Sequence, residues 1–172
     1  IESVGVLHHM DDPVAGWRLL CGLLMDGGVM SIALYSETAR RYCVAAQRAI
    51  AREGLSASPA DIRAFRAGVL AGGRPELAEL QKYTDFYSAS ACRDLLFHYK
   101  EHRFTLPQLA GILDELGLRF IGFTFGDSKI RALYRERFPE DETMTDLTRW
   151  AQFEEMNPDT FTGMYYFWCQ KV

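Results

Sequence analysis

The opening segment of the chain, IESVGVLHHMDDP, constrains the fold more than any other stretch of the sequence. Its first residues form a short apolar run typical of a buried strand, and His8 and His9 follow as a turn. Asp12 and Pro13 then match the N-cap and the first position of a helix, which continues with an apolar stripe. The segment therefore predicts a strand, a turn and a helix in direct succession.

Three further segments have the character of strands. Val29–Tyr35 is a continuous apolar run bounded by turn residues, which is typical of a strand buried on both faces. Leu118–Phe125 and Gly163–Lys171 are rich in aromatic residues, which favour strands and are expected to pack in the core and on the sheet faces. Since helical stretches separate these segments, the pattern predicts an α/β fold, with residues 1–172 as one domain.

The helical stretches carry recognisable start and stop signals. Between residues 36 and 117 the sequence predicts a large helical insertion, in which Ser36 caps a first helix and Gly54 ends it. Arginines 40, 41, 48 and 52 are expected on the solvated face of that helix. The remaining predicted caps are Ser58, Ser88 or Ser90, Thr105, Asp127 and Thr145.

Composition excludes several classes of protein. The net charge of −4 over 172 residues argues against a nucleic-acid partner, which needs clustered Lys and Arg. No apolar run approaches the roughly 20 residues that span a membrane. Without a secretory signal pattern and with four widely spaced cysteines, the sequence is expected to be cytoplasmic, with reduced and mostly buried thiols.

Four blocks of sequence, taken in order, resemble a bacterial branch of class I S-adenosylmethionine (SAM) methyltransferases, often found within larger multidomain chains. The blocks are SVGVLHHMDDP at 3–13, GGVMSIALYSE at 27–37, DFYSASACRDLLFHYKEHRFTLPQL at 85–109 and NPDTFTGMYYFW at 157–168. In that family the sheet has the strand order 3-2-1-4-5-7-6, with strand 7 antiparallel. The resemblance implies that this chain supplies strands 4, 5, 6 and 7, the C-terminal half of a Rossmann-like methyltransferase sheet.

The resemblance also implies which parts of the site are present. Ser3, Val4 and Gly5 would line the SAM pocket, and His8 and His9 would lie at its mouth as candidate catalytic bases. The glycine-rich loop and the ribose-binding acid of the family belong to strands 1 and 2. The isolated chain is therefore expected to bind SAM weakly or not at all and to be inactive alone. The free edge of strand 4 is expected to pair with the missing N-terminal half, a second copy or a swapped segment.

The acceptor would be a small molecule or a protein side chain, which the sequence does not identify. The resemblance places Tyr35, Ser36 and Glu37 toward this acceptor. Asp85, Tyr87, Arg93, His98 and His102 are further candidates within or beside the helical insertion, with a local Arg–Asp network as the alternative for the first three.

Two other functions stay open at the level of sequence. The first is a non-enzymatic interaction domain that uses the helical insertion to bind a partner. The second is a zinc hydrolase, because His98-Tyr99-Lys100-Glu101-His102 matches the H-x-x-E-H pattern, which on a helix places two histidines on one face. No third ligand stands out, so no metal site is assigned.

Overall fold

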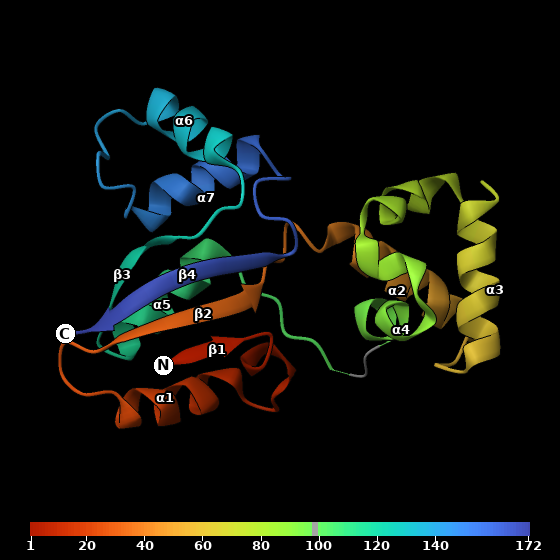
Figure 1. The fold of residues 1–172 in the computed structure, drawn as a ribbon, viewed down its shortest axis with the longest axis horizontal. Helices are drawn as coiled ribbons and strands as arrows, with labels where there is room; N and C mark the ends of the chain where they lie inside the picture. Colours follow the sequence, from red (N-terminus) through yellow and green to blue (C-terminus); the bar gives the residue numbers. More distant parts are fainter. Residues whose placement is uncertain (98–99) are drawn as a thin grey trace. The chain divides into compact units, whose positions relative to one another are not determined.

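The computed structural model describes residues 1–97 and 100–172 (Figure 1). The chain divides into two compact units. Residues 1–39 and 100–172 form the sheet unit, and residues 40–99 form the helical unit. The predicted single domain thus contains two compact parts, and each is described by itself below.

The sheet unit is built on four strands: β1 (Glu2–Val4), β2 (Val29–Tyr35), β3 (Leu118–Phe123) and β4 (Met164–Lys171). Their order across the sheet is β1-β2-β4-β3. β1 runs parallel to β2, whereas β4 is antiparallel to both β2 and β3. The α/β fold and the antiparallel last strand are therefore as the sequence predicts.

The two central strands differ in how they are buried. In β2, residues Met30, Ile32, Ala33 and Leu34 are all fully buried, so both faces of this strand are covered, as its unbroken apolar run indicates. β4 instead alternates: Tyr165, Phe167 and Cys169 are buried, while its other aromatic residues remain partly exposed. Because successive side chains of a strand point to opposite faces, only half of the predicted aromatic cluster reaches the core.

Helices of the sheet unit begin largely where the sequence predicts. α1 (Pro13–Leu23) is capped by Asp12, α5 (Leu106–Glu115) by a capping box of Thr105 and Gln108, and α6 (Ser128–Arg137) by Asp127. α7 (Leu147–Met156) is capped by Asp146 and not by the predicted Thr145. The Asp146 carboxylate accepts hydrogen bonds from two backbone amides of the first turn, whereas the Thr145 hydroxyl bonds to Thr143.

An aromatic core joins α6 and α7 to the sheet. The Tyr134 ring stacks on Trp150 with centroids 3.8 Å apart, and Phe123 packs edge-on against Trp150. In Figure 1 the α6–α7 pair lies on the β3–β4 side of the sheet unit, while α1 lies beside β1. The large aromatic side chains of the core therefore lie between the α6–α7 pair and the β3–β4 side of the sheet.

The helical unit contains α2 (Arg41–Arg52), α3 (Pro59–Leu70), α4 (Ala89–Leu96) and the 3-10 turns η2 (Pro75–Lys82) and η3 (Thr84–Tyr87). Its own core gathers mostly aliphatic and small side chains, among them Cys43, Ala46, Ile62, Phe65, Leu80, Phe86 and Leu95. Ser58 caps α3 and Ser88 caps α4, as predicted.

The start of this unit corrects two expectations. α2 begins at Arg41, and Ser36 does not cap it, because the Ser36 hydroxyl accepts the amide of Ala39 one turn earlier. Arg40 is only 2% exposed and donates to the backbone oxygen of Leu95, so it does not lie on the solvated face. The arginine is held inside the unit by a backbone acceptor.

The helical unit is also shorter than the predicted insertion at 36–117. Leu106, Leu109 and Leu113 of α5 pack in the core of the sheet unit, which places that helix outside the insertion. Within the described parts of the chain, each of the four cysteines is buried, and no helix is long and apolar enough to cross a bilayer.

Candidate active site

The carboxyl ends of β1 and β2 lie side by side because the two strands are parallel neighbours. In open α/β sheets this edge is where ligands bind. The 3-10 turn η1 (Leu7–His9) follows β1 there, and Ser36 and Glu37 follow β2. The structure therefore gathers the predicted catalytic residues and part of the predicted acceptor site at one edge.

His8, His9 and Tyr35 form a cluster of three rings at this edge. The His8 ring stacks on Tyr35 with centroids 3.7 Å apart and planes 21° from parallel. His9 packs edge-on against both, at 4.4 Å from His8 and 5.6 Å from Tyr35. His8 is fully buried and His9 only partly. Of the two candidate bases, His9 is the one accessible to a bound molecule.

The hydrogen bonding of His9 fixes the tautomer of its neutral ring. Its Nδ1 lies 2.9 Å from the backbone oxygen of Lys100, and a carbonyl oxygen only accepts hydrogen bonds. The proton of the neutral ring therefore resides on Nδ1, and the lone pair on Nε2. The hydrogen bond to Lys100 thus sets both the tautomer and the orientation of the ring.

Residues 100–104 hold the two strand ends together. His102 donates its amide to the His8 oxygen at 2.8 Å, and Phe104 donates to the Tyr35 oxygen at 2.9 Å. The Glu37 amide in turn donates a hydrogen bond to the Phe104 oxygen at 2.9 Å. The predicted acceptor residue His102 is thus a backbone partner of the ring cluster. Its Nε2 is buried and makes no hydrogen bond within residues 1–97 and 100–172.

Charged side chains surround the same segment. The guanidinium of Arg103 lies 3.0 Å from the Glu37 carboxylate and 3.3 Å from that of Glu101. Lys100 forms an ion pair with the exposed Asp11, which holds the pKa of that carboxyl below its usual range. Glu37 is exposed, as an acceptor-binding residue must be, but it is already paired with a cation.

Ser36 is fully buried, so in this structure it does not face an acceptor. Its hydroxyl donates to the carboxylate of Glu154 at 2.8 Å, and Tyr165 donates to the same carboxylate at 2.8 Å. Burial raises the pKa of Glu154, while these two hydrogen bonds work to lower it. Burial also raises the pKa of the Tyr165 hydroxyl. Glu154 thus ties α7 to the end of β2, an anchoring role that local sequence does not reveal.

The three residues predicted to line the SAM pocket differ in accessibility. Ser3 is 8% exposed and faces the interior, whereas Val4 is 36% exposed. Gly5 follows β1 with φ +72°, and a Cβ added there would meet no heavy atom within 4 Å. Val4 and Gly5 therefore leave open space at the end of β1, which suits one wall of a cofactor pocket. Ser3 is buried within the sheet unit and adds nothing to this open space.

The remaining predicted acceptor residues belong to the helical unit. Asp85, Tyr87 and Arg93 are all exposed there, and the Tyr87 hydroxyl donates to the Gln81 oxygen at 2.9 Å. The sequence did not single out Arg66, whose guanidinium donates to the backbone oxygens of Phe86 and Tyr87 and so holds η3 in place. The role of Asp85, Tyr87 and Arg93 in acceptor binding stays a prediction.

His98 lies outside the described residues, so the H-x-x-E-H pattern is seen only in part. α4 ends at Leu96, and Glu101 and His102 are not helical. Among residues 1–97 and 100–172, no group of three His, Cys, Asp or Glu side chains is arranged to hold a metal ion. The helical geometry on which the zinc alternative depends is absent from the described part of this motif.

Comparison with known proteins supports the fold. No family model matches the chain. It is 27% identical to an uncharacterized protein of Synechococcus sp. over an alignment of 168 residues, and the match covers 89% of this chain and 39% of that protein. Its structure resembles that of PKMT2 from Rickettsia typhi, a protein lysine methyltransferase, with a TM-score of 0.68 and 11% identity. This likeness covers 98% of the chain, which therefore has a methyltransferase-like fold.

Both relatives are much longer than the part that is matched. The chain spans 39% of the Synechococcus protein and 34% of PKMT2. The likeness describes the shared region, and the activities of the whole proteins belong to larger polypeptides.

Proposed function

We propose that this chain is the acceptor-side, C-terminal half of a SAM-dependent methyltransferase domain. The observation that carries the proposal is the sheet order β1-β2-β4-β3, with β4 antiparallel and with the His8–His9–Tyr35 cluster at the carboxyl ends of β1 and β2. On this proposal β1, β2, β3 and β4 correspond to strands 4, 5, 6 and 7 of the family sheet. The fold likeness to PKMT2 supports this correspondence.

SAM, when bound, supplies an electrophilic methyl group. In this chain Val4 and Gly5 would form one wall of its pocket, because they leave open space at the end of β1. The rest of the pocket would come from the N-terminal half of the domain. We therefore expect the isolated chain to bind SAM weakly or not at all.

His9 is the best candidate for a proton acceptor. The hydrogen bond from Nδ1 to the Lys100 oxygen fixes the tautomer whose Nε2 carries the lone pair, and an imidazole lone pair is what a general base uses. His8 would act as a positioning residue, since its buried ring stacks on Tyr35 and packs edge-on against His9. Methyl transfer also requires the nucleophile to be aligned with the methyl group, and the contacts of residues 100–104 would hold this edge rigid.

The outer edge of β1 supports the proposal of a missing half. β1 has only three residues, and Ile1, Val4 and Val6 are 42%, 36% and 55% exposed. β3, the other outer strand, is longer and contains an irregularity between Phe120 and Gly122, which is a usual protection of a permanent edge. β1 pairs with β2 in regular register, and Glu2 is its one charged residue. We infer that another strand, from the N-terminal half of the same domain, pairs with β1.

A titration of SAM into this chain and into the longer parent polypeptide tests the proposal. We expect the parent to bind SAM and the isolated chain to bind it at least about tenfold more weakly. Binding by the isolated chain below about 10 μM, or −7 kcal/mol, would overturn the division of the SAM site. A folded parent that binds no SAM would favour the interaction-domain alternative.

The catalytic assignment needs a separate measurement in the parent polypeptide. Because PKMT2 is a protein lysine methyltransferase, protein lysine is the first acceptor to test, with transfer of a labelled methyl group as the readout. We expect His9→Gln to lower kcat by about 10²–10⁴-fold. The control is Arg131→Gln on the exposed surface of α6, which should leave kcat unchanged. Equal activity of the His9 variant and the control would exclude His9 as the base.

A further inference from the structure

The exposed positions of α2, labelled in Figure 1, are all arginine or alanine. Its opposite face packs into the core of the helical unit through Cys43, Ala46, Ala49 and Ile50. Positions 41, 45, 48 and 52 follow one another at spacings of four, three and four residues, which places them along one side of a helix. These positions hold Arg41, Ala45, Arg48 and Arg52, and α2 contains no acidic residue. We call these four residues the arginine stripe.

Two arginines of the stripe make no bond to the described parts of the chain. Arg48 and Arg52 are exposed, and neither forms an ion pair or a hydrogen bond with residues 1–97 or 100–172. Glu53, the acid next to Arg52, is instead bonded to Arg74, whose Nη2 lies 2.6 Å from its carboxylate. This hydrogen bond, with a smaller effect of the Arg52 charge, lowers the pKa of Glu53 below its usual range. The guanidinium donors of Arg48 and Arg52 are therefore open to a partner.

The stripe also carries much of the positive charge that the helical unit has in excess. Residues 40–99 contain nine Lys and Arg against six Asp and Glu, whereas the sheet unit contains ten against 17. Four of the nine basic side chains are already bonded within the helical unit: Arg40, Arg66, Arg74 and Lys82. Arg41 lies over the Tyr42 ring at 4.2 Å and donates to its hydroxyl. The surface complementary to this unit is therefore an anionic one.

The spacing of the two open arginines suits an extended chain. Arg48 and Arg52 are four residues apart, which corresponds to about 6 Å along a helix. In an extended segment, side chains two positions apart point to the same face and lie about 6.7 Å from each other. A guanidinium binds a carboxylate through two parallel N–H donors. Two acidic residues at alternate positions of a strand can therefore each meet one arginine, and the short side chain of Ala45 leaves room for the strand beside them.

We propose that the arginine stripe binds an extended acidic segment of another protein, in which acidic residues at alternate positions pair with Arg48 and Arg52. A nucleic acid fits the molecule less well, because phosphate binding gains strength from many cations and the whole chain has a net charge of −4. The stripe belongs to the helical unit and is distinct from the ring cluster of the sheet unit, and its occupation requires no methyl transfer.

Three peptides of equal length and charge test the spacing. Each contains two glutamates among threonines, which favour an extended chain, and the glutamates are two, one or three positions apart. The peptides are titrated into the whole chain at low salt, and the backbone amides of α2 and the Nε–H signals of Arg48 and Arg52 are followed by NMR. We expect the peptide with glutamates two positions apart to bind about two- to fivefold more tightly than the others, since only it forms both pairs on one face.

The outcomes that would overturn the proposal are specific. Equal binding of the three peptides would show attraction by charge alone, without the proposed pairing. The absence of shifts at Arg48 and Arg52 with every peptide would exclude the site. Tighter binding of a six-nucleotide single-stranded DNA than of the best peptide would show that the stripe recognises nucleic acid instead.

Variants test the two arginines separately. Arg48→Gln and Arg52→Gln should each weaken the best peptide about two- to fivefold and remove its advantage over the other two. Glutamine has nearly the helix propensity of arginine, so α2 should stay folded. The matched control is Arg131→Gln, which removes the same charge from an exposed position of α6 and should change the affinity much less. An equal loss for Arg131→Gln would mean that net charge, and not the stripe, determines binding.

Discussion

Asp141 and Glu154 are two buried carboxylates of the sheet unit, each hydrogen-bonded to a tyrosine, yet their pKa values shift in opposite directions. Asp141 is 9% exposed and accepts from the hydroxyl of Tyr134 at 2.6 Å. Glu154 is 5% exposed and accepts from the hydroxyl of Tyr165 at 2.8 Å. The pKa of Asp141 lies below its ordinary value, while that of Glu154 lies above it.

The difference comes from the other donors. Burial works to raise the pKa of Asp141, but hydrogen bonds from Tyr134, from the amides of Thr145 and Asp146 and from the Thr143 hydroxyl outweigh it. Glu154 has Ser36 as its second donor, and within the described parts of the chain its carboxylate receives hydroxyl groups only. Asp141 thus has four donors, which outweigh its burial, whereas the two donors of Glu154 do not offset the burial of that carboxylate.

The largest effect should come from removing the better-satisfied carboxylate. Asp141→Ala leaves two backbone amides and the Tyr134 hydroxyl without their acceptor, and we expect a loss of about 3 kcal/mol in the free energy of unfolding. Urea denaturation measures this loss. The neighbouring Glu142→Ala is the control, since Glu142 is exposed and should cost less than about 0.5 kcal/mol. Equal losses for both variants would contradict the role given to the Asp141 hydrogen bonds.

The opposite pKa shifts should give opposite dependences of stability on pH. The lowered pKa of Asp141 contributes stability above the ordinary value of 3.8, and this is lost as pH falls through the folded pKa. The raised pKa of Glu154 contributes stability below the ordinary value of 4.5, and this is lost as pH rises through the folded pKa. We expect Asp141→Asn to flatten the acid side of the stability profile and Glu154→Gln to flatten the decline above pH 4.5.

Unfolding free energies measured at steps between about pH 3 and 8 distinguish the two contributions. A decline above pH 4.5 that persists unchanged in Glu154→Gln would show that another group causes it. The Asn and Gln variants keep the size of each side chain, so the comparison isolates the charge.

The smallest effect should follow from removing one donor of Glu154. Tyr165→Phe deletes one hydrogen bond while keeping the ring in the core, and we expect a loss of about 1 kcal/mol at neutral pH. It should also raise the pKa of Glu154 further, which moves the decline in stability to higher pH. A double-mutant cycle with Glu154→Gln measures the coupling, and additive losses would rule out a direct interaction.

Local features of the sequence predicted the fold well. The run Val29–Tyr35 forms β2 with those bounds, and Asp12, Thr105 and Asp127 cap the expected helices. Each signal depends on residues a few positions apart. The errors arise where a distant partner competes, as with Ser36, whose hydroxyl bonds Glu154 118 positions away.

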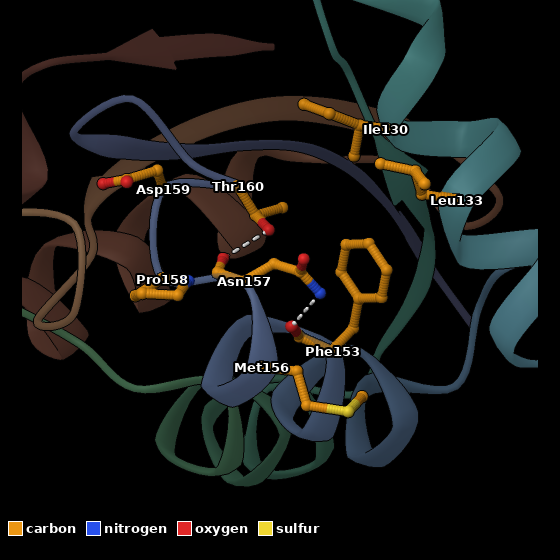
Figure 2. Close-up of a pocket in the computed structure, with 8 residues that line it drawn as sticks. All are labelled: Ile130, Leu133, Phe153, Met156, Asn157, Pro158, Asp159 and Thr160. Atoms are coloured by element: carbon orange, nitrogen blue, oxygen red, sulfur yellow. Dashed lines mark hydrogen bonds between the residues drawn. The ribbon is translucent and has the colours of Figure 1, made fainter.

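The candidate site shows the same limit. The resemblance to class I methyltransferases identified His8, His9 and Tyr35 as candidate site residues. The sequence did not reveal that His8 is buried and stacked on the Tyr35 ring, or that residues 100–104 hold the strand ends together through backbone hydrogen bonds. Backbone pairing of an irregular segment leaves no side-chain pattern to detect. The sequence also showed no sign of the cavity lined by Ile130 and Leu133 of α6 and by Phe153 and Met156 of α7 (Figure 2), because that cavity depends on how the two helices pack.

The backbone bonds that join Tyr35 and Glu37 to Phe104 also bear on how this protein can change in evolution. They fasten together the points where the chain leaves the sheet unit and returns to it. Because the ends are already closed, everything between them behaves as one long loop, whose doubling in length costs only about 0.6 kcal/mol. The helical unit is therefore a replaceable module. Lengthening it, exchanging it or shortening it to a linker should leave the sheet unit folded.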